Sequence, residues 1–283
     1  ANKIITIGDR THVAWLDSPP EGFRVRLATL DRRTGKWSRT HTVGKAYDNH
    51  GGPALTCDSE GYLHITYHPH HHAFRYRRSK RPNDASAWGD EILFGERLTY
   101  PTLICGRDDT LYFTARRSDA NPWWVELWEK KPNADWTRVG PVIHSRDKGY
   151  AHFQESLCWG PDHQTIHLAC RIHEASDKSA YGRKQTVAYL KTEDFGRTWL
   201  RADGTPIKGP ITVDNIDVLA RGGVDVDRGL RSGSVAVGPD GVPRVMYSVV
   251  EPGNVDTIIA TSDGQGGWQR RSLKRELNKA WKG

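Results

Sequence analysis

A repeat of roughly fifty residues is the feature that most constrains how this chain can fold. Five short strand-like segments each follow a turn rich in Gly and Asp, and their starts are 50, 49, 55 and 77 residues apart. Each segment is followed by a second strand-like segment and then by a tryptophan. The five segments are 12–16, 62–67, 111–116, 166–171 and 243–248, and the tryptophans are Trp37, Trp88, Trp136, Trp199 and Trp268.

The segments alternate in polarity or are rich in β-branched and aromatic residues, as pleated strands are. Turn sequences such as Pro239-Asp-Gly are typical of β-hairpins. The sequence therefore predicts an all-β fold, a β-propeller of four-stranded antiparallel blades, in which radial repetition protects the sheet edges. We expect a single domain over residues 1–283, with five repeats visible and a helix only in the tail 272–281. A sandwich or jelly roll would not explain a tryptophan at one place in each repeat.

The segment Lys191–Trp199 resembles the Asp-box of sialidase-type propellers, with Thr192 in the place of the usual serine. Ser262–Trp268 is a degenerate copy of the same motif. An Asp-box is a structural hairpin at the rim of a blade, so it supports the fold and says nothing about chemistry.

The chain is basic, with a formal net charge of +7 and a pI of about 9.2. A basic protein attracts polyanions, either nucleic acid or an acidic polysaccharide. We expect no nucleic-acid partner, because no nucleic-acid-binding motif is present. We also expect no membrane partner, because no apolar run is long enough to span a bilayer. The cysteines Cys57, Cys105, Cys158 and Cys170 lie far apart, which favours free thiols in strands and leaves a disulfide or a structural zinc as alternatives.

Histidines are concentrated at the end of one repeat and the start of the next, as His50, His68 and the run His70, His71 and His72. Three interpretations are open. Imidazoles bind zinc, although adjacent histidines on a loop diverge. They can simply be surface residues beside a turn. They can also perform acid–base chemistry, to which histidine is suited near neutral pH.

The next repeats supply partners for these histidines. Tyr100 lies at about the place in its repeat that His50 has in the one before, and Arg116 lies where His68 to His70 lie. We therefore expect His50, His70, Tyr100 and Arg116 to converge on one face. Ordinary strand packing for Tyr100 and a surface ion pair for Arg116 are the alternatives. Other candidates are Arg117, then Tyr150 and His152 as walls of the site. Asp225 and Asp227 could bind calcium, although no complete loop of oxygen ligands surrounds them in the sequence.

The pieces Asp48-Asn-His50-Gly-Gly-Pro53, His68-Pro-His70, Thr99-Tyr100-Pro101 and Arg116 resemble the BNR-4 type of propeller, which includes seven-bladed ulvan lyases. The resemblance spans residues 1 to about 250. It implies a polysaccharide lyase whose catalytic residues are His50, His70, Tyr100 and Arg116. Binding residues would be His71, His72, Arg117, Tyr150 and His152.

The resemblance also implies an anionic, uronate-containing polysaccharide as substrate. We expect no cofactor in catalysis, with a structural zinc or calcium left open, and a monomer that is secreted or periplasmic because a polymer must be cut outside the cytoplasm. In a lyase, Tyr100 would transfer protons, His70 or His50 would share the base role, and Arg116 with the other histidine would hold the uronate carboxylate. The alternatives are a hydrolase that removes rhamnose from glucuronate and a non-catalytic carbohydrate-binding propeller.

Overall fold

The structure, a computed structural model, describes residues 3–119, 121–174 and 183–280, and it is built almost entirely of β-strands. The one α-helix of the described residues, α1 (Lys274–Ala280), confirms the predicted helical tail, and a short 3₁₀ helix, η1 (Val224–Val226), precedes β18. No helix in the described ranges is long and apolar enough to cross a membrane. The strands are β1 (Ile4–Ile7), β2 (Arg10–Asp17), β3 (Arg24–Asp31), β4 (Lys36–Trp37), β5 (His41–Lys45), β6 (Ala54–Cys57), β7 (Leu63–Tyr67), β8 (His72–Arg81), β9 (Asp84–Trp88), β10 (Ile92–Cys105), β11 (Leu111–Arg117), β12 (Trp124–Lys130), β13 (Thr137–His144), β14 (Ala151–Trp159), β15 (Ile166–Glu174), β16 (Lys184–Thr192), β17 (Asp217–Gly222), β18 (Gly229–Val237), β19 (Pro243–Glu251), β20 (Asn254–Ser262) and β21 (Trp268–Ser272).

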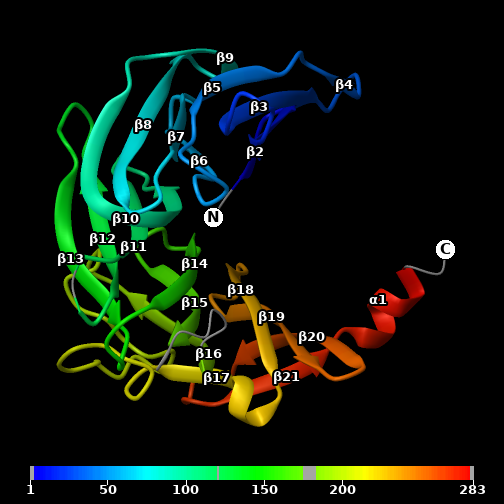
Figure 1. Ribbon diagram of the computed structural model, residues 1–283. Coiled ribbons are helices and arrows are strands. Elements are labelled where there is room, and N and C mark those ends of the chain that lie inside the picture. The colour runs from blue at the N-terminus through cyan, green and yellow to red at the C-terminus, as the bar shows by residue number, and fades with distance from the viewer. Residues whose placement is uncertain (1–2, 120, 175–182, 281–283) are drawn as a thin grey trace. The chain divides into compact units, whose positions relative to one another are not determined.

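Successive strands pair antiparallel, so the chain runs as a series of meanders (Figure 1). It divides into two compact units, the first made of residues 1–119 and 126–140 and the second of 120–125 and 141–283. The first unit contains the sheet β1 to β5 and most of the sheet β6 to β13, and the second contains the sheets β14 to β17 and β18 to β21. The antiparallel all-β prediction is confirmed. The single domain and the number of blades stay predictions.

The second and third repeats are not separate sheets, because β8 pairs with β10 and joins them into one eight-stranded sheet. In this pairing Phe74 lies opposite Phe94, and His72 lies opposite Leu98. The rings of Phe74, Phe94 and Phe113 pack in the core beneath it. The sequence predicted four-stranded blades, and the extra pairing is possible because β10 is long enough to serve both neighbours.

The second strand of each meander is the strand that the sequence repeat revealed. All residues of β7 and of β15 are buried, because each lies between two partner strands and is covered on both faces. The buried side chains include polar ones, such as His64 in β7 and Arg171 in β15. The first unit buries Leu63, Ile65 and Tyr67 from β7, and the second buries Leu168 and Ile172 from β15.

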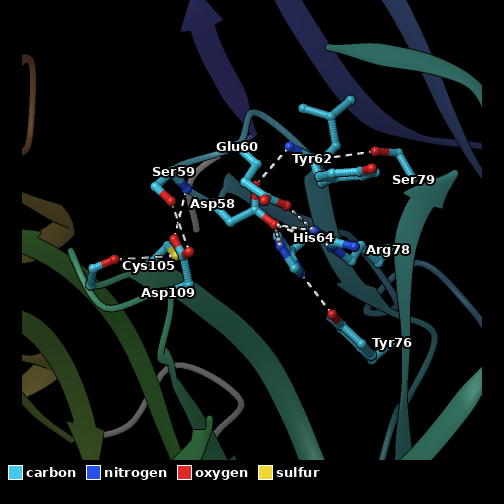
Figure 2. Close-up of polar contacts among 12 residues, drawn as sticks. Asp58, Ser59, Glu60, Tyr62, His64, Tyr76, Arg78, Ser79, Cys105 and Asp109 are labelled. Atoms are coloured by element: carbon cyan, nitrogen blue, oxygen red, sulfur yellow. Dashed lines mark hydrogen bonds and ion pairs between the residues drawn. The ribbon is translucent and has the colours of Figure 1, made fainter. Parts of the chain in front are cut away.

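A buried histidine on the second strand contacts a tyrosine on the third in two of the meanders. In the first unit, His64 Nδ1 lies 2.6 Å from Tyr76 Oη and its Nε2 lies 3.0 Å from Asp58 Oδ2 (Figure 2). In the second unit, His167 Nδ1 lies 2.6 Å from Tyr189 Oη. In both cases the tyrosine pairs across the ladder with the residue two positions after the histidine. Because the pair recurs at one register in both units, it belongs to the repeat and not to a site.

The Asp-box predicted at 191–199 forms a closed hydrogen-bonded turn. Asp194 Oδ1 accepts hydrogen bonds from the Thr198 amide at 2.8 Å and from Thr192 Oγ1 at 2.8 Å. Asp194 Oδ2 accepts from Thr198 Oγ1 at 2.6 Å, and the Gly196 amide donates to Thr192 Oγ1 at 2.8 Å. Thr192 therefore replaces the usual serine without loss of its acceptor role, and Trp199 at the end of the motif is buried.

The five tryptophans that mark the repeats do not share one environment. Trp136 stacks on Phe94 with ring centroids 4.2 Å apart, Trp268 meets Tyr189 at 5.0 Å, and Trp199 is 4% exposed. Trp88 packs against the core of the first sheet. Trp37, by contrast, is 56% exposed.

The four cysteines are free thiols, as expected, so the alternative of a disulfide is excluded.

Replacing Asp194 with alanine should lower the free energy of unfolding by about 1–3 kcal/mol, because three donors lose their acceptor in a partly buried turn. Urea unfolding followed by tryptophan fluorescence measures the change. Glu193→Ala is the matched control, since Glu193 is exposed and makes only a surface ion pair with Lys191. Equal effects of the two variants would contradict the proposed role of the motif.

Stability should fall as the pH is lowered from about 6.5 to 4. Burial, reinforced by Lys191, lowers the pKa of His167 to about 4, and burial with Arg171 does the same for His173. In this window the unfolded chain binds protons that the folded chain does not, so the free energy of unfolding decreases, by on the order of 2 kcal/mol. Urea unfolding at pH 7.5, 6.0 and 4.5 tests this, and His167→Gln should show a shallower dependence. A wild-type stability that is constant across these pH values would refute the explanation.

Candidate active site

The four residues predicted to converge all lie in the first unit. His50 follows a turn before β6, and His70 lies in the loop between β7 and β8. Tyr100 lies in the middle of β10, and Arg116 lies near the end of β11. The structure brings them together through the pairings of β8 with β10 and of β10 with β11.

Asp48 connects the two histidines. Its Oδ2 lies 2.6 Å from His70 Nδ1, and its Oδ1 lies 3.0 Å from His50 Nδ1 and accepts the His50 amide hydrogen bond at 2.7 Å. A carboxylate only accepts, so the Nδ1 atom of each ring carries the proton. In the neutral form, the Nε2 atoms of His50 and His70 then carry free lone pairs. The arrangement presents two oriented bases on the side away from Asp48.

Asp48 remains ionised in this position. Burial acts to raise the pKa of its carboxyl, but the hydrogen bonds from the His50 amide and from the His70 and His50 rings outweigh burial and lower the pKa. The carboxylate thus provides a fixed negative charge behind both imidazoles, which stabilises either ring when it takes up a proton.

Three imidazoles form a row beside the tyrosine. The ring centroids of His50 and His70 are 3.8 Å apart and stacked, and those of His70 and His71 are 4.4 Å apart. The Tyr100 ring lies 5.8 Å from His50. The side chains of His50 and His70 are 32% and 26% exposed, so both rings are accessible from solvent.

Arg116 lies behind this row and is fully buried. Its guanidinium carbon is 4.8 Å from the centroid of the Tyr100 ring, a cation–π contact, and its Nη2 lies 3.4 Å from His71 Nε2. The expectation that Arg116 holds a substrate carboxylate stays a prediction, and in this arrangement the arginine has no exposed surface. Its charge reaches the site through Tyr100 and His71.

His71 is held neutral in a directed chain of hydrogen bonds. Burial and the neighbouring Arg116 lower the pKa of His71 to about 4. Arg116 donates to His71 Nε2, so Nδ1 carries the proton and donates to Ser118 Oγ, which in turn donates to the Arg97 carbonyl at 3.0 Å. His71 therefore positions the guanidinium and is not a base at neutral pH.

Three site residues adopt left-handed backbone conformations, with φ of 101° at His68, 62° at His71 and 63° at Tyr100. Tyr100 lies in a bulge where the register of β10 against β11 shifts between Thr99 and Thr102. Such conformations cost about 1–3 kcal/mol each for residues with a side chain and persist where surrounding structure enforces them. Here the Thr99 hydroxyl accepts the His71 amide hydrogen bond at 2.9 Å, which fixes the loop against the bulge.

The predicted binding residues differ in how they are used. His72 is exposed and stacks on Tyr47 at 4.5 Å, so it can contact a ligand. Arg117 points to the face opposite Arg116, as successive strand residues do, and forms ion pairs with Asp119 and Glu126. Those two carboxylates occupy the guanidinium, so nothing in the geometry supports a binding role for Arg117.

Tyr150 and His152 belong to the second unit, so their part in a site on the first unit stays a prediction. Tyr150 is 42% exposed and its ring lies 5.2 Å from that of Trp123, which is itself partly buried by this contact. His152 Nδ1 lies 3.0 Å from Arg171 Nη2.

Asp48, His50 and His70 are also, within the described ranges, the one group of three side chains that could hold a metal ion. Their ligand atoms all lie within 4.8 Å of one another. A carboxylate and two imidazoles suit zinc. The expectation of a structural zinc or calcium, and of Asp225 and Asp227 as calcium ligands, stays a prediction.

Sequence reasoning missed the roles of Asp48 and Ser118. Asp48 enters the sequence predictions only as part of the piece Asp48–Pro53, although an aspartate that binds the backbone amide two residues on is typical of an Asx turn. Ser118 carries no such signal, because its contact with His71 joins residues 47 positions apart.

The profile of the BNR repeat-containing family matches residues 10–276. A PL25 ulvan lyase of Pseudoalteromonas sp. (strain PLSV) is 30% identical over 141 residues, which are 44% of this chain and 27% of that protein. An ulvan lyase of Nonlabens ulvanivorans is 26% identical over 264 residues, covering 79% of this chain and 55% of that protein. The chain thus spans about half the length, or less, of these curated relatives.

The solved structure of a PL25 ulvan lyase bound to -[GlcA(1-4)Rha3S]- superposes with a TM-score of 0.75 at 19% identity, covering 95% of this chain and 69% of that one. At this identity the likeness establishes the fold alone, and it confirms the all-β, propeller-like fold predicted from the repeat.

Replacing Asp48 with asparagine should release the two histidines from a single tautomer, because the amide no longer demands a proton on both Nδ1 atoms. Long-range ¹⁵N–¹H NMR spectra of the imidazole rings at pH 8, assigned with His50→Gln and His70→Gln, report the tautomers. Asp119→Asn, which lies outside the row, is the control. Unchanged tautomers in Asp48→Asn would show that the carboxylate does not orient the pair.

Proposed function

This chain belongs to the BNR repeat-containing family, and on that basis we propose that it is a polysaccharide lyase that cleaves a uronate-containing anionic polysaccharide of the ulvan type by β-elimination. The observation that carries the proposal is the pair of imidazoles, His50 and His70, oriented by one carboxylate beside Tyr100. Curated proteins similar to this chain are named ulvan lyases, and one solved structure with the same fold holds a -[GlcA(1-4)Rha3S]- fragment.

β-Elimination makes three demands on a site. A base must remove the proton at C5 of the uronate, whose electron pair forms the C4–C5 double bond as the bond from C4 to the glycosidic oxygen breaks. The departing oxygen must receive a proton, and no water is consumed. The negative charge that builds on the carboxylate must be offset, because otherwise the C5 proton is too weakly acidic.

The row of side chains can meet these demands. His50 and His70 each present an Nε2 lone pair toward solvent, so one ring serves as the base while the other, once protonated, offsets the substrate carboxylate. Tyr100 lies beside His50 and carries the proton between base and leaving oxygen. The buried Arg116 stabilises negative charge that builds on the Tyr100 oxygen during transfer.

A glycoside hydrolase is less well supported. Retaining and inverting hydrolases use two carboxyl groups on either side of the scissile bond. Asp48 is engaged by two histidines and lies behind them, so it is not placed to contact a sugar.

We also propose, from the size of the substrate, that the protein is secreted or periplasmic.

Absorbance of the unsaturated uronate, followed with ulvan, glucuronan and capped arabinogalactan as substrates, tests the proposal. We expect a rising signal with at least one acidic polymer and a fall in kcat by on the order of 10²-fold or more in Tyr100→Phe, with KM nearly unchanged, since only proton transfer is removed. Tyr47→Phe, an exposed tyrosine beside His72, is the control and should retain activity.

New reducing ends without absorbance of an unsaturated uronate would show that the protein is a hydrolase and not a lyase. Binding to the polymers with neither signal would indicate a carbohydrate-binding protein. Full activity of Tyr100→Phe would remove Tyr100 from the mechanism while leaving the reaction class in place.

A further inference from the structure

Trp37 departs from the pattern set by the other repeat tryptophans. The equivalent indoles of Trp136, Trp199 and Trp268 pack on or in the core, whereas Trp37 is 56% exposed on the edge strand β4, which pairs only with β3 (Figure 1). Within the part of the chain that the structure describes, no other aromatic ring contacts it. An exposed large indole at a position where the repeat favours burial calls for a binding explanation.

Trp37 borders a hollow of about 560 Å³ on the first unit. The hollow lies over β3, β4 and the start of β5, and the turn between β8 and β9 closes its other side. Arg10, Lys36 and Arg39 line it together with the indole and His41, so its wall combines one flat apolar surface with three cationic groups.

Two of the three arginine and lysine side chains that line this hollow form no ion pair in the described part of the chain, and the third, Arg10, donates from Nη1 to the Asn83 carbonyl at 2.7 Å. Lys36 and Arg39 form no ion pair with any residue in the described ranges, whereas the lining carboxylates are engaged. Asp31 accepts the amide hydrogen bond of Thr34, and Asp84 pairs with Arg81. Lys36 and Arg39 are thus available to bind an anion, with the carboxylate of Asp31, the ladder partner of Lys36, beside them.

The segment that carries these groups is fixed. The Ser38 amide donates to the Thr29 carbonyl at 2.8 Å, the Thr29 amide donates to Ser38 Oγ at 3.0 Å, and Ser38 Oγ donates to the Arg39 carbonyl at 2.7 Å. Trp37 and Arg39 flank this serine on either side. Their spacing is thus set before a ligand arrives, which reduces the entropy lost on binding.

We propose that this hollow is a second binding site, separate from the imidazole row, for a chain of acidic polysaccharide. The indole would stack on the face of a sugar ring, and Lys36, Arg39 and Arg10 would bind carboxylate or sulfate groups on neighbouring sugars. A single-stranded nucleic acid is the less favoured ligand, because sites for it stack successive bases on several aromatic side chains and this hollow has one.

Strand β5 links the hollow to the imidazole row. His41, its first residue, lines the hollow, and the carbonyl of Lys45, its last, accepts a hydrogen bond from His68 Nδ1 at 2.9 Å. Four residues of strand span about 13 Å. One long polymer can therefore occupy both places, which raises its effective concentration at the row, whereas a short fragment cannot. This benefit to turnover rests on the proposed function, but the binding itself does not.

Affinity electrophoresis in gels containing ulvan, dextran or single-stranded DNA tests the binding, with a Tyr100→Phe starting protein that leaves the polymer intact. We expect ulvan to retard the protein and Trp37→Ala to weaken the apparent affinity roughly fivefold, as loss of one stacking contact would. Arg39→Glu should weaken it as well while keeping the indole. Arg33→Glu, an exposed neighbour outside the hollow with the same change of charge, is the matched control.

Several results would overturn the proposal. The affinity for ulvan could be unchanged in Trp37→Ala, or Arg39→Glu and Arg33→Glu could weaken it equally. The retardation that depends on Trp37 could be caused by dextran or DNA instead of ulvan. Trp37→Ala could also change the oligomeric state, which would make the hollow a contact between copies of the chain. If the wild type is a lyase, Trp37→Ala should raise KM for long ulvan and leave kcat and the turnover of a tetrasaccharide unchanged. If it shows no lyase activity, the proposed function fails, and the electrophoresis experiment still tests whether the hollow binds an acidic polysaccharide.

Discussion

The pairing of β8 with β10 is the interaction on which the candidate site depends. It joins two repeats into one sheet and places His72 opposite Leu98, so that the histidine loop lies directly against the bulge that carries Tyr100. The hydrogen bond from the His71 amide to Thr99 then locks loop and bulge together. Without this pairing the histidines and the tyrosine would belong to different sheets, and no single row of rings would form.

The row differs from most acid–base sites in how its charge is distributed. One carboxylate serves two imidazoles, and a buried arginine lies behind the tyrosine at the other side. The negative charge of Asp48 lies behind the two bases, and the positive charge of Arg116 lies behind the phenol. This arrangement favours transfer of a proton from the substrate to a histidine over the reverse transfer. Because the guanidinium is buried, its field acts through low-dielectric surroundings and is little screened by salt.

The sequence was sufficient to predict the antiparallel strands and the meeting of His50, His70, Tyr100 and Arg116, because equivalent positions in successive repeats lie at equivalent heights in a sheet. It was not sufficient to predict the burial of Arg116. Every residue of β11 from Leu111 to Arg116 is buried, because the strand lies between β10 and β12 and is covered on both faces, and a charged residue at its end gives no sign of this. The joining of two repeats and the exposure of Trp37 likewise depend on pairings between distant strands, which local pattern does not encode.

The left-handed backbone at His68, His71 and Tyr100 has a consequence for how this site can vary. Glycine or asparagine would adopt the same angles at lower cost. Substitutions that raise stability at these positions would therefore remove the aromatic side chains that the site uses. Each of these positions is a place where thermal robustness and chemistry compete. Laboratory evolution for heat tolerance alone should therefore erode this loop and bulge before it touches the surrounding strands.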